Sequence, residues 1–211
     1  MFAVVVFNGE ISDYEYCKGF LDAADLIICA DGGAAHLRKL GISPNILLGD
    51  FDSIDPGDLR YFSGKEVEII NFPPKKDMTD AELAIDTAVK RGYRDIVIMG
   101  GLGARIDHTL SNIFLLKNLL DRGIRAGIID KQNEIFLTAD NISIRAQDGY
   151  GLTLLPLSER VDGIRTEGLY YKLAGETIHM GSSRGVSNAF VCDIAKISIT
   201  SGLLLVIKSK L

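Results

Sequence analysis

The segment 95–107, DIVIMGGLGARID, carries the pattern that decides the fold. The residues DIVIM favour a strand, and the glycine-rich loop GGLG separates them from a helical pattern over 106–122. A strand, a turn at its carboxyl end and a helix form one half of a βαβ unit. Glycines in that turn let backbone amides approach a phosphate, and the helix N-terminus favours an anion. The segment therefore predicts an α/β fold with an anion-binding turn.

The same alternation continues on both sides of this segment, along residues 1–130. Apolar runs such as VVVF and LIIC alternate with helical patterns. We predict five further strands, at 3–7, 26–30, 45–48, 67–71 and 125–130, and helical segments at 13–21, 33–40, 58–62 and 80–91. The near-continuous apolar strands suit a sheet that is covered on both faces. Residues 1–130 are thus predicted to form an α/β domain with a six-stranded, largely parallel sheet.

Residues 131–211 follow a different period. Apolar and polar residues alternate at 142–145, 177–180 and 196–200, and a short apolar run at 203–207 follows the turn signal Ser201-Gly202. Alternation with period two is typical of half-buried strands, and no helical pattern accompanies it here. We therefore predict that residues 131–211 form a second, all-β domain, a β-sandwich.

The composition excludes several classes of protein. The 211 residues are 47% hydrophobic and 24% charged, which is typical of a globular protein and not of a disordered chain. The net charge of −5 argues against nucleic-acid binding, because neutralising phosphates requires an excess of Lys and Arg. No apolar run approaches the roughly 20 residues of a membrane helix. The three scattered cysteines argue against a zinc site or a disulfide frame. We expect a cytoplasmic protein that does not bind membranes.

Acidic residues follow several of the predicted strands at the point where each strand ends. They are Asp31, Asp50, Asp52, Asp77, Asp80 and Asp107. Ligands of an open parallel sheet bind beyond the carboxyl ends of its strands, so we expect these carboxylates at one rim. The spacing of Asp50 and Asp52 lets two carboxylates share a hard cation such as Mg²⁺. Asp and Ser also form turns, but repulsion within such an acidic rim favours a cation.

Cationic side chains lie near the same rim. Arg105 can bind a phosphate bidentately. Lys75 and Lys76 stand on a loop that a polyphosphate can reach, and a purely solvated role stays open for both. Thr79 forms a capping box with Glu82 at the start of the next helix. The residues alone thus predict an α/β domain that binds phosphates with Mg²⁺, as phosphoryl transfer requires, without identifying the substrate.

Five segments, in the expected order, make the chain resemble the thiamine pyrophosphokinase family. They are ADGG (30–33), LGDFDS (48–53), KDMTDAELA (76–84), GGLGARIDH (100–108) and GVSN (185–188). The resemblance implies an N-terminal α/β domain, a C-terminal β-sandwich, and a homodimer. Its active sites would lie between the α/β domain of one chain and the β domain of the other. It also implies the reaction, in which the hydroxyl of thiamine attacks the β-phosphorus of ATP, pyrophosphate is transferred and AMP leaves.

The resemblance also implies roles for individual residues. Asp50, Asp52 and Asp80 match residues that hold Mg²⁺ or its waters. Asp77 matches the other acidic residue of the motif, and which of these four carboxylates accepts the thiamine proton stays open. The residues that match the ATP side are Asp31, Gly32, Gly33, Gly101, Arg105 and Asp107. Those that match the thiamine side, in the β domain, are Ser187 and Asn188.

The chain departs from the family in one respect, because some members place a tryptophan near the thiamine ring and this chain has no Trp. Two roles stay open for Phe190, which follows the Ser-Asn pair: stacking on the cationic thiazolium, or packing in the core of the β domain.

Three other functions also stay open. The first is pyrophosphate transfer to a hydroxymethyl pterin. The second is non-catalytic binding of thiamine or a nucleotide, which the intact acidic motifs argue against. The third is a nicotinamide dehydrogenase, which is disfavoured because Ile106 stands where the dinucleotide fingerprint requires its third glycine.

Overall fold

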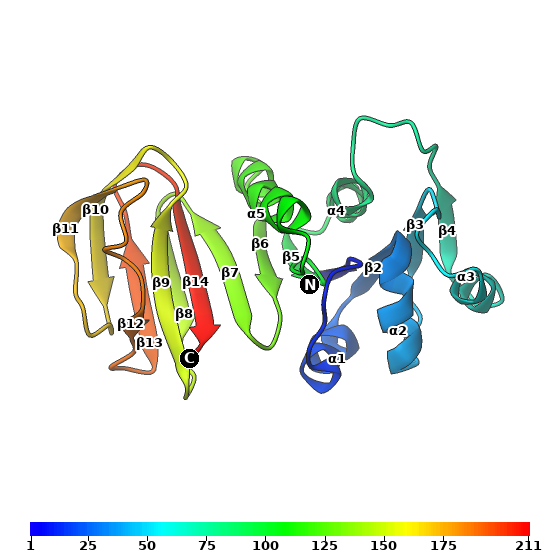
Figure 1. Cartoon of the computed structure of the whole chain (residues 1–211), viewed down its shortest axis with the longest axis horizontal. Coiled ribbons are helices and arrows are strands. Elements are labelled where there is room, and N and C mark those ends of the chain that lie inside the picture. The colour runs from blue at the N-terminus through cyan, green and yellow to red at the C-terminus, as the bar shows by residue number, and fades with distance from the viewer. The chain divides into compact units, whose positions relative to one another are not determined.

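The computed structural model describes residues 1–211 and divides into two compact units, Met1–Lys131 and Gln132–Leu211 (Figure 1). Each unit has its own arrangement of strands and its own hydrophobic core. None of the helices combines the length and the apolar character that crossing a membrane would require.

The first unit is built on a sheet of six strands. They are β1 (Ala3–Val6), β2 (Leu26–Ala30), β3 (Ile46–Gly49), β4 (Glu68–Asn71), β5 (Asp95–Met99) and β6 (Arg125–Ile129). The order is β6-β5-β1-β2-β3-β4, and every neighbouring pair is parallel. The predicted parallel sheet is therefore confirmed. The three strands β1, β2 and β3 are buried along their whole length, as near-continuous apolar runs require, whereas β4 is the more exposed edge strand.

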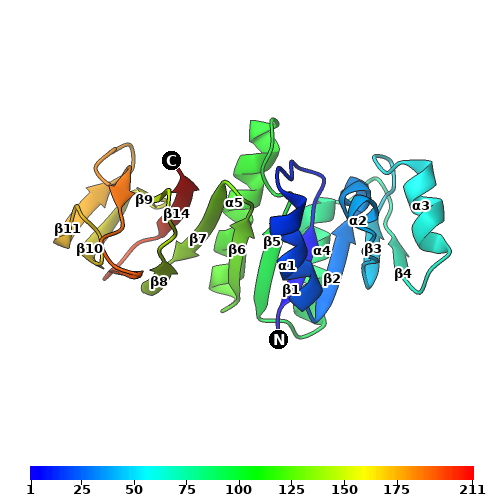
Figure 2. The ribbon, with the colours of Figure 1, turned by 90° about the horizontal axis from the view of Figure 1, so that it is seen from below.

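Helices cover both faces of this sheet (Figures 1 and 2). On one face lie α1 (Tyr14–Ala23), α2 (Ala34–Leu40) and α3 (Pro56–Ser63), and on the other lie α4 (Asp80–Lys90) and α5 (Ile106–Asp121). Local chemistry sets their ends. Asp13, Asp55 and Thr79 accept backbone N–H bonds as N-caps of α1, α3 and α4, and Gly41 ends α2 in the left-handed conformation. The helix predicted from Gly33 begins one residue later, because Asp31–Gly33 forms a 3₁₀ turn.

The strand order reverses at the centre of the sheet. The chain proceeds outward from β1 through β2 and β3 to β4, and then returns to place β5 on the other side of β1. The helices that follow β1 and β5, α1 and α5, consequently lie on opposite faces of the sheet. Such a reversal opens a crevice at the carboxyl ends of the two strands, which is where open α/β sheets bind ligands.

The second unit contains eight strands in two antiparallel groups. They are β7 (Asn133–Thr138), β8 (Asn141–Arg145), β9 (Tyr150–Pro156), β10 (Arg160–Glu167), β11 (Ala174–His179), β12 (Asn188–Ala189), β13 (Ile194–Ser198) and β14 (Leu204–Lys210). One group has the order β12-β9-β14-β7 and the other β11-β10-β13-β8. Buried side chains of both groups form one core, which includes Leu152, Val206, Ile164 and Ile197. The predicted β-sandwich is confirmed.

Several strands of the sandwich have no clear signal in the sequence. The strand β9 is buried at five of its seven positions, so its apolar residues do not alternate. The strand β10 has register shifts around Asp162 and Gly163, which interrupt the period. Phe190 packs against the core of the sandwich. Of the two roles that the sequence left open for it, the structure therefore shows core packing.

Candidate active site

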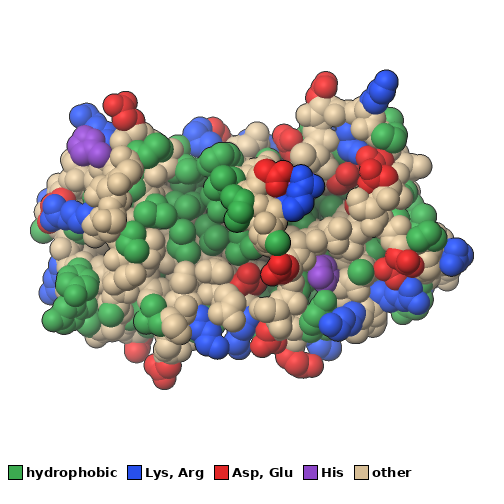
Figure 3. Space-filling view, viewed as in Figure 1, with side chains coloured by type: hydrophobic (Ala, Val, Ile, Leu, Met, Phe, Trp, Pro, Cys, Tyr) green, Lys and Arg blue, Asp and Glu red, His purple; other side chains and the backbone are tan.

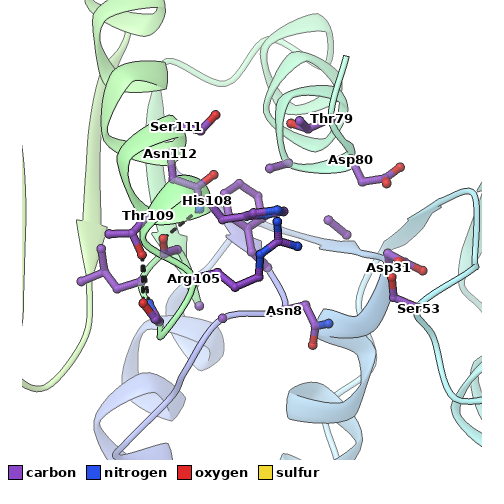
Figure 4. Close-up of a pocket in the computed structure, with 18 of the residues that line it drawn as sticks. Asn8, Asp31, Ser53, Thr79, Asp80, Arg105, His108, Thr109, Ser111 and Asn112 are labelled. Atoms are coloured by element: carbon purple, nitrogen blue, oxygen red, sulfur yellow. Dashed lines mark hydrogen bonds between the residues drawn. The ribbon is translucent and has the colours of Figure 1, made fainter. Parts of the chain in front are cut away.

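A cavity of about 1110 Å³ lies in the first unit at the carboxyl ends of the central strands (Figure 4). Its walls come from the loop after β1 (residues 8–12), the glycine loop after β5 (residues 100–105), and the first turns of α4 and α5. Asp31 and Ser53, which follow β2 and β3, complete one side of it. The cavity thus occupies the reversal point of the strand order.

Two of these walls are joined backbone to backbone. Gly9 N donates a hydrogen bond to Gly100 O at 2.8 Å, and Glu10 N donates to Leu102 O at 2.7 Å. A Cβ on Gly9 would lie 2.2 Å from Gly100 O, and Gly100 itself has a φ of +62°. Side chains of α5 secure the glycine loop, since Asn112 Nδ2 donates to Gly101 O at 2.8 Å. These glycines are therefore required by close packing and backbone conformation.

A half-buried histidine supports the loop after β1. His36 Nε2 lies 2.8 Å from Gly9 O, and His36 Nδ1 lies 2.8 Å from the Tyr14 hydroxyl. A carbonyl oxygen only accepts hydrogen bonds, so Nε2 donates, and in the neutral ring Nδ1 then accepts from the tyrosine hydroxyl. Burial lowers the pKa of His36 below its usual value, and nearby Lys39 lowers it further, against the opposing effect of the Gly9 carbonyl. The imidazole is thereby held neutral.

Three carboxylates gather beside the cavity. Asp31, Asp50 and Asp52 each offer an oxygen, and these oxygens lie within 4.8 Å of one another. Asp31 is 7% exposed and has a φ of +44°, and its Oδ1 atom is buried without a hydrogen-bond partner. Burial raises the pKa of Asp31 above its usual value, and the carboxylates of Asp80 and Asp52 raise it further. A buried, unpartnered carboxylate oxygen within an acidic cluster is what a bound cation would stabilise.

The fourth carboxylate, Asp80, is linked to this cluster through Lys76. Lys76 Nζ lies 2.7 Å from Asp50 Oδ2 and 3.2 Å from Asp80 Oδ1. The hydrogen bond from Lys76 holds the pKa of Asp50 below its usual range. Asp77 lies apart from these residues, because its side chain is exposed and does not line the cavity.

The residues predicted for the ATP side occupy two kinds of position. Gly101, Arg105, Asp107 and Asp31 line the cavity. Arg105 and Asp107 form an exposed bidentate ion pair, with Arg105 Nη2 2.6 Å from Asp107 Oδ2. Gly32 and Gly33 lie behind the wall: a Cβ on Gly32 would lie 2.4 Å from Asn8 Nδ2, and one on Gly33 would lie 2.7 Å from Val6 O.

The second unit has a smaller cavity of about 380 Å³, whose lining includes Asn188, Tyr170 and Tyr171. Asn188 is buried and bonded, whereas Ser187 is exposed with a φ of +59°. Tyr170 and Tyr171 are 66% and 64% exposed, and their rings meet edge to face, with their centroids 4.9 Å apart.

Comparison with known proteins connects both sites to one family. A family model described as the catalytic domain of thiamin pyrophosphokinase matches residues 17–128, and one described as its vitamin B1 binding domain matches residues 141–204. The chain belongs to the thiamin pyrophosphokinase family. The predicted family, fold class and enzyme class are therefore confirmed.

Individual members of the thiamin pyrophosphokinase family resemble the chain over nearly its whole length. Thiamine pyrophosphokinase of Bacillus subtilis is 32% identical over 193 residues, which cover 90% of each chain. Thiamine pyrophosphokinase 1 of Oryza sativa subsp. japonica is 26% identical and covers 96% of this chain and 85% of its own. The crystal structure of the Bacillus subtilis protein superposes with a TM-score of 0.91, at 29% identity, over 100% of this chain and 99% of the other.

The sequence-based predictions for this thiamin pyrophosphokinase family member missed two groups of residues at the two sites. The loop at residues 8–12 lines the cavity, and its position directly after a central strand is a signal that could have found it. The exposed pair Tyr170 and Tyr171 lies in a segment without clear periodicity. Only two adjacent tyrosines, between Leu169 and Lys172, mark it.

Proposed function

We propose that the chain transfers pyrophosphate from ATP to the hydroxyl of thiamine, giving thiamine diphosphate and AMP. The observation that carries this proposal is the cavity at the strand reversal, which combines a glycine loop with an acidic cluster. In the proposal, residues 1–130 bind ATP and Mg²⁺, and residues 131–211 bind thiamine. The descriptions of the two matching family models support this division of roles.

The glycine loop and the start of α5 form the proposed binding site for the phosphates of ATP. Gly101 lines the cavity, and the helix N-terminus directly after the loop favours an anion. Arg105 is held by Asp107 in an exposed pair, so its guanidinium can exchange that partner for a phosphate at little cost. Asp31 borders this site, and Gly32 and Gly33 allow its wall to pack closely against Asn8 and Val6.

The acidic cluster fits a magnesium ion. Carboxylate oxygens are the ligands that Mg²⁺ prefers, and three of them lie within 4.8 Å of one another. We propose that Asp50, Asp52 and Asp80 hold the ion or its waters, with the unpartnered oxygen of Asp31 beside them. When bound, the ion supplies positive charge that neutralises the phosphates as negative charge shifts to the leaving group.

The remaining chemistry belongs to the substrates and the carboxylates. The hydroxyl oxygen of thiamine forms a bond to the β-phosphorus of ATP, and the bond from that phosphorus to the oxygen bridging the α-phosphate breaks, so AMP leaves with that oxygen. The hydroxyl proton passes to one of the carboxylates at the cavity. Asp77 is the least suited of the four candidates, because Asp50 and Asp52 belong to the acidic cluster and Asp80 is linked to it through Lys76, whereas the exposed Asp77 takes part in neither contact.

The thiamine side of the proposal rests on the second unit. Thiamine carries a cationic thiazolium, and exposed tyrosine faces attract cations. Tyr170 and Tyr171 provide such faces beside Asn188, so they supply the aromatic surface for which the chain has no Trp. Ser187, an exposed residue directly before Asn188 in the chain, is the proposed polar contact.

We also propose a homodimer in which the β domain of one chain completes the ATP-binding cavity of the other. Ile106, Leu110 and Phe114 are spaced four residues apart on α5 and are 64%, 46% and 54% exposed. Figure 3 shows apolar side chains gathered over this helix, whose first turns line the cavity. An exposed apolar stripe beside a binding site supports an interface there.

The proposal is tested by measuring AMP release from ATP and Mg²⁺ with and without thiamine. AMP that appears only with thiamine, together with a diphosphate product, supports it. ADP as the product would indicate transfer of a single phosphoryl group and contradict it. Turnover with a hydroxymethyl pterin in place of thiamine would support the alternative acceptor. Thermal stabilisation by thiamine without turnover would support the non-catalytic alternative.

A further inference from the structure

Lys76 stands between two of the carboxylates assigned to the metal. It belongs to the loop between β4 and α4, and its side chain is 13% exposed. Its ammonium lies 2.7 Å from Asp50 Oδ2 and 3.2 Å from Asp80 Oδ1. The neighbouring Lys75 is exposed and does not line the cavity. One lysine of the pair is therefore built into the acidic cluster, and the other is solvated.

The charges around Lys76 explain why it is held there. Two carboxylates, those of Asp50 and Asp80, adjoin the ammonium, and oxygens of Asp31 and Asp52 lie within 4.8 Å of an oxygen of Asp50. Burial opposes the charge on Lys76, but the hydrogen bond to Asp50 and the ion pair with Asp80 keep its pKa above the usual value. The nearest guanidinium on the cavity wall, that of Arg105, is paired with Asp107. Lys76 is thus the cation that partly offsets the repulsion among these carboxylates.

The ammonium and a divalent ion compete for the same ligand. Asp50 is the closest partner of Lys76 and also a member of the group of three carboxylates. Like charges within a few ångströms repel one another strongly in a partly buried site, and a divalent ion doubles the repulsion that a single charge exerts. A cation bound by Asp50 therefore expels the ammonium. The flexible four-carbon stem of lysine allows that movement.

We propose that Lys76 is an internal counter-ion, which occupies part of the cation site in the free protein and moves to the polyphosphate when the metal–nucleotide complex binds. The inference rests on the proposed function for the identity of that ligand. Lys76 already lines the cavity, so its released ammonium remains within the site where the phosphates are expected. Two consequences follow: the divalent ion alone binds weakly, and ion and nucleotide each strengthen the binding of the other.

The test is a titration of the nucleotide-free protein with Mn²⁺, followed by electron paramagnetic resonance. Lys76→Met removes the competing charge, and we expect Mn²⁺ to bind at least about tenfold more tightly than to the unmodified protein. Lys75→Met is the matched control and is expected to leave the affinity unchanged. Equal or weaker Mn²⁺ binding by folded Lys76→Met would overturn the proposal. If that variant does not fold, Lys76→Gln serves the same test.

A second titration measures the coupling between ion and nucleotide. A non-hydrolysable ATP analogue is expected to raise the Mn²⁺ affinity of the unmodified protein by a larger factor than that of Lys76→Met. An equal factor in both proteins would contradict the transfer of the ammonium to the polyphosphate. Because neither titration measures turnover, thiamine-dependent AMP release with unchanged Mn²⁺ binding would reject this inference and leave the proposed function intact.

Discussion

The side chain of Asn188 holds the backbone of Tyr171 from both sides. Its Oδ1 atom accepts a hydrogen bond from Tyr171 N at 2.9 Å, and its Nδ2 atom donates one to Tyr171 O at 2.7 Å. Asn188 is 7% exposed, whereas Tyr171 is 64% exposed. A buried amide thus fixes the position of an aromatic surface that faces solvent. The proposed role of Asn188 in thiamine binding is therefore to fix the position of that aromatic surface.

Replacing this amide is expected to affect stability and thiamine binding together. Asn188→Ala removes the partner of the part-buried N–H and C=O of Tyr171, which costs about 1–2 kcal/mol. The loop then loses its fixed position, so we expect the KM for thiamine to rise by about tenfold or more and the KM for ATP to change little. Thermal unfolding and separate KM measurements check both effects. Ser187→Ala, which keeps the backbone bond to Thr153, is the control for stability. Equal rises of both KM values would show that Asn188 only supports the fold.

The exposed tyrosine itself gives a second prediction. Tyr171→Ala removes an aromatic face without opening the core, so stability should stay within about 0.5 kcal/mol. Loss of a cation–π contact of about 0.5–2 kcal/mol predicts a roughly two- to thirty-fold weaker binding of thiamine, with Tyr171→Phe close to the unmodified protein. Isothermal titration with thiamine measures the difference. Unchanged binding by Tyr171→Ala would place the thiazolium elsewhere.

Substitutions of two carboxylates in the acidic cluster should have similar effects on activity and different effects on stability. Asp52 is exposed and accepts a hydrogen bond only from neighbouring groups such as Ser53, whereas Asp50 pairs with the largely buried Lys76. We expect both Asp52→Ala and Asp50→Ala to lower the rate of AMP release at least about 100-fold, because each removes a ligand of the charge-neutralising ion. Only Asp50→Ala should also lower the melting temperature. Normal rates at saturating Mg²⁺ would refute the metal assignment.

Much of the fold follows from the sequence because its strands are short apolar runs with clear boundaries. The parallel strands at 26–30 and 95–99 were predicted with their observed bounds, since a buried α/β strand is apolar throughout. The same property hides β9, which is buried on both faces within an antiparallel sandwich. Residues 131–211 were predicted as a sandwich from only four of their eight strands.

The site could be predicted only in part, because spacing along the chain does not fix direction in space. The position of Asp31, Asp50 and Asp52 after their strands correctly indicated a common rim. Nothing in the sequence shows that Asp77 points away from it or that Asn188 is buried. A shift of one residue, along the loop that carries Asp77 or along the two-residue strand that carries Asn188, reverses the direction in which a side chain points.

The neutral histidine beneath the cavity predicts a pH dependence of stability. The pKa of His36 is lower in the folded than in the unfolded protein, so the unfolded chain binds more protons as the pH falls below about 6.5. The stabilising effect of neutral His36 is therefore complete above that pH and is lost as the pH falls toward the folded-state pKa. We expect His36→Gln to be less stable than the unmodified protein at pH 7. Its melting temperature should also fall less than that of the unmodified protein between about pH 7 and 5.

The exposed His108 provides the control for this measurement. It lies in the same unit, so His108→Gln should reproduce the pH profile of the unmodified protein. A profile of His36→Gln that runs parallel to that of the unmodified protein would show that His36 does not lose its proton on folding.

The last prediction concerns the contact between the loops after β1 and β5. A Cβ on Gly9 would lie 2.2 Å from Gly100 O and 2.3 Å from Leu102 O, whereas the nearest atom to a Cβ on Gly103 is Glu10 N at 3.4 Å. Both glycines line the cavity, and only Gly9 has no room for a methyl group. Gly9→Ala forces two backbone segments apart, and we expect it to cost about 1–3 kcal/mol or more of unfolding free energy.

The same displacement should reach the nucleotide site. Separation of the two loops moves the glycine loop that we propose for the phosphates, so Gly9→Ala should raise the KM for ATP by about tenfold or more. Gly103→Ala, a methyl group added to the same cavity wall, should leave both stability and KM nearly unchanged. Denaturant unfolding and the KM for ATP measure the two effects. If the two variants behave alike, the contact between Gly9 and Gly100 does not position the nucleotide.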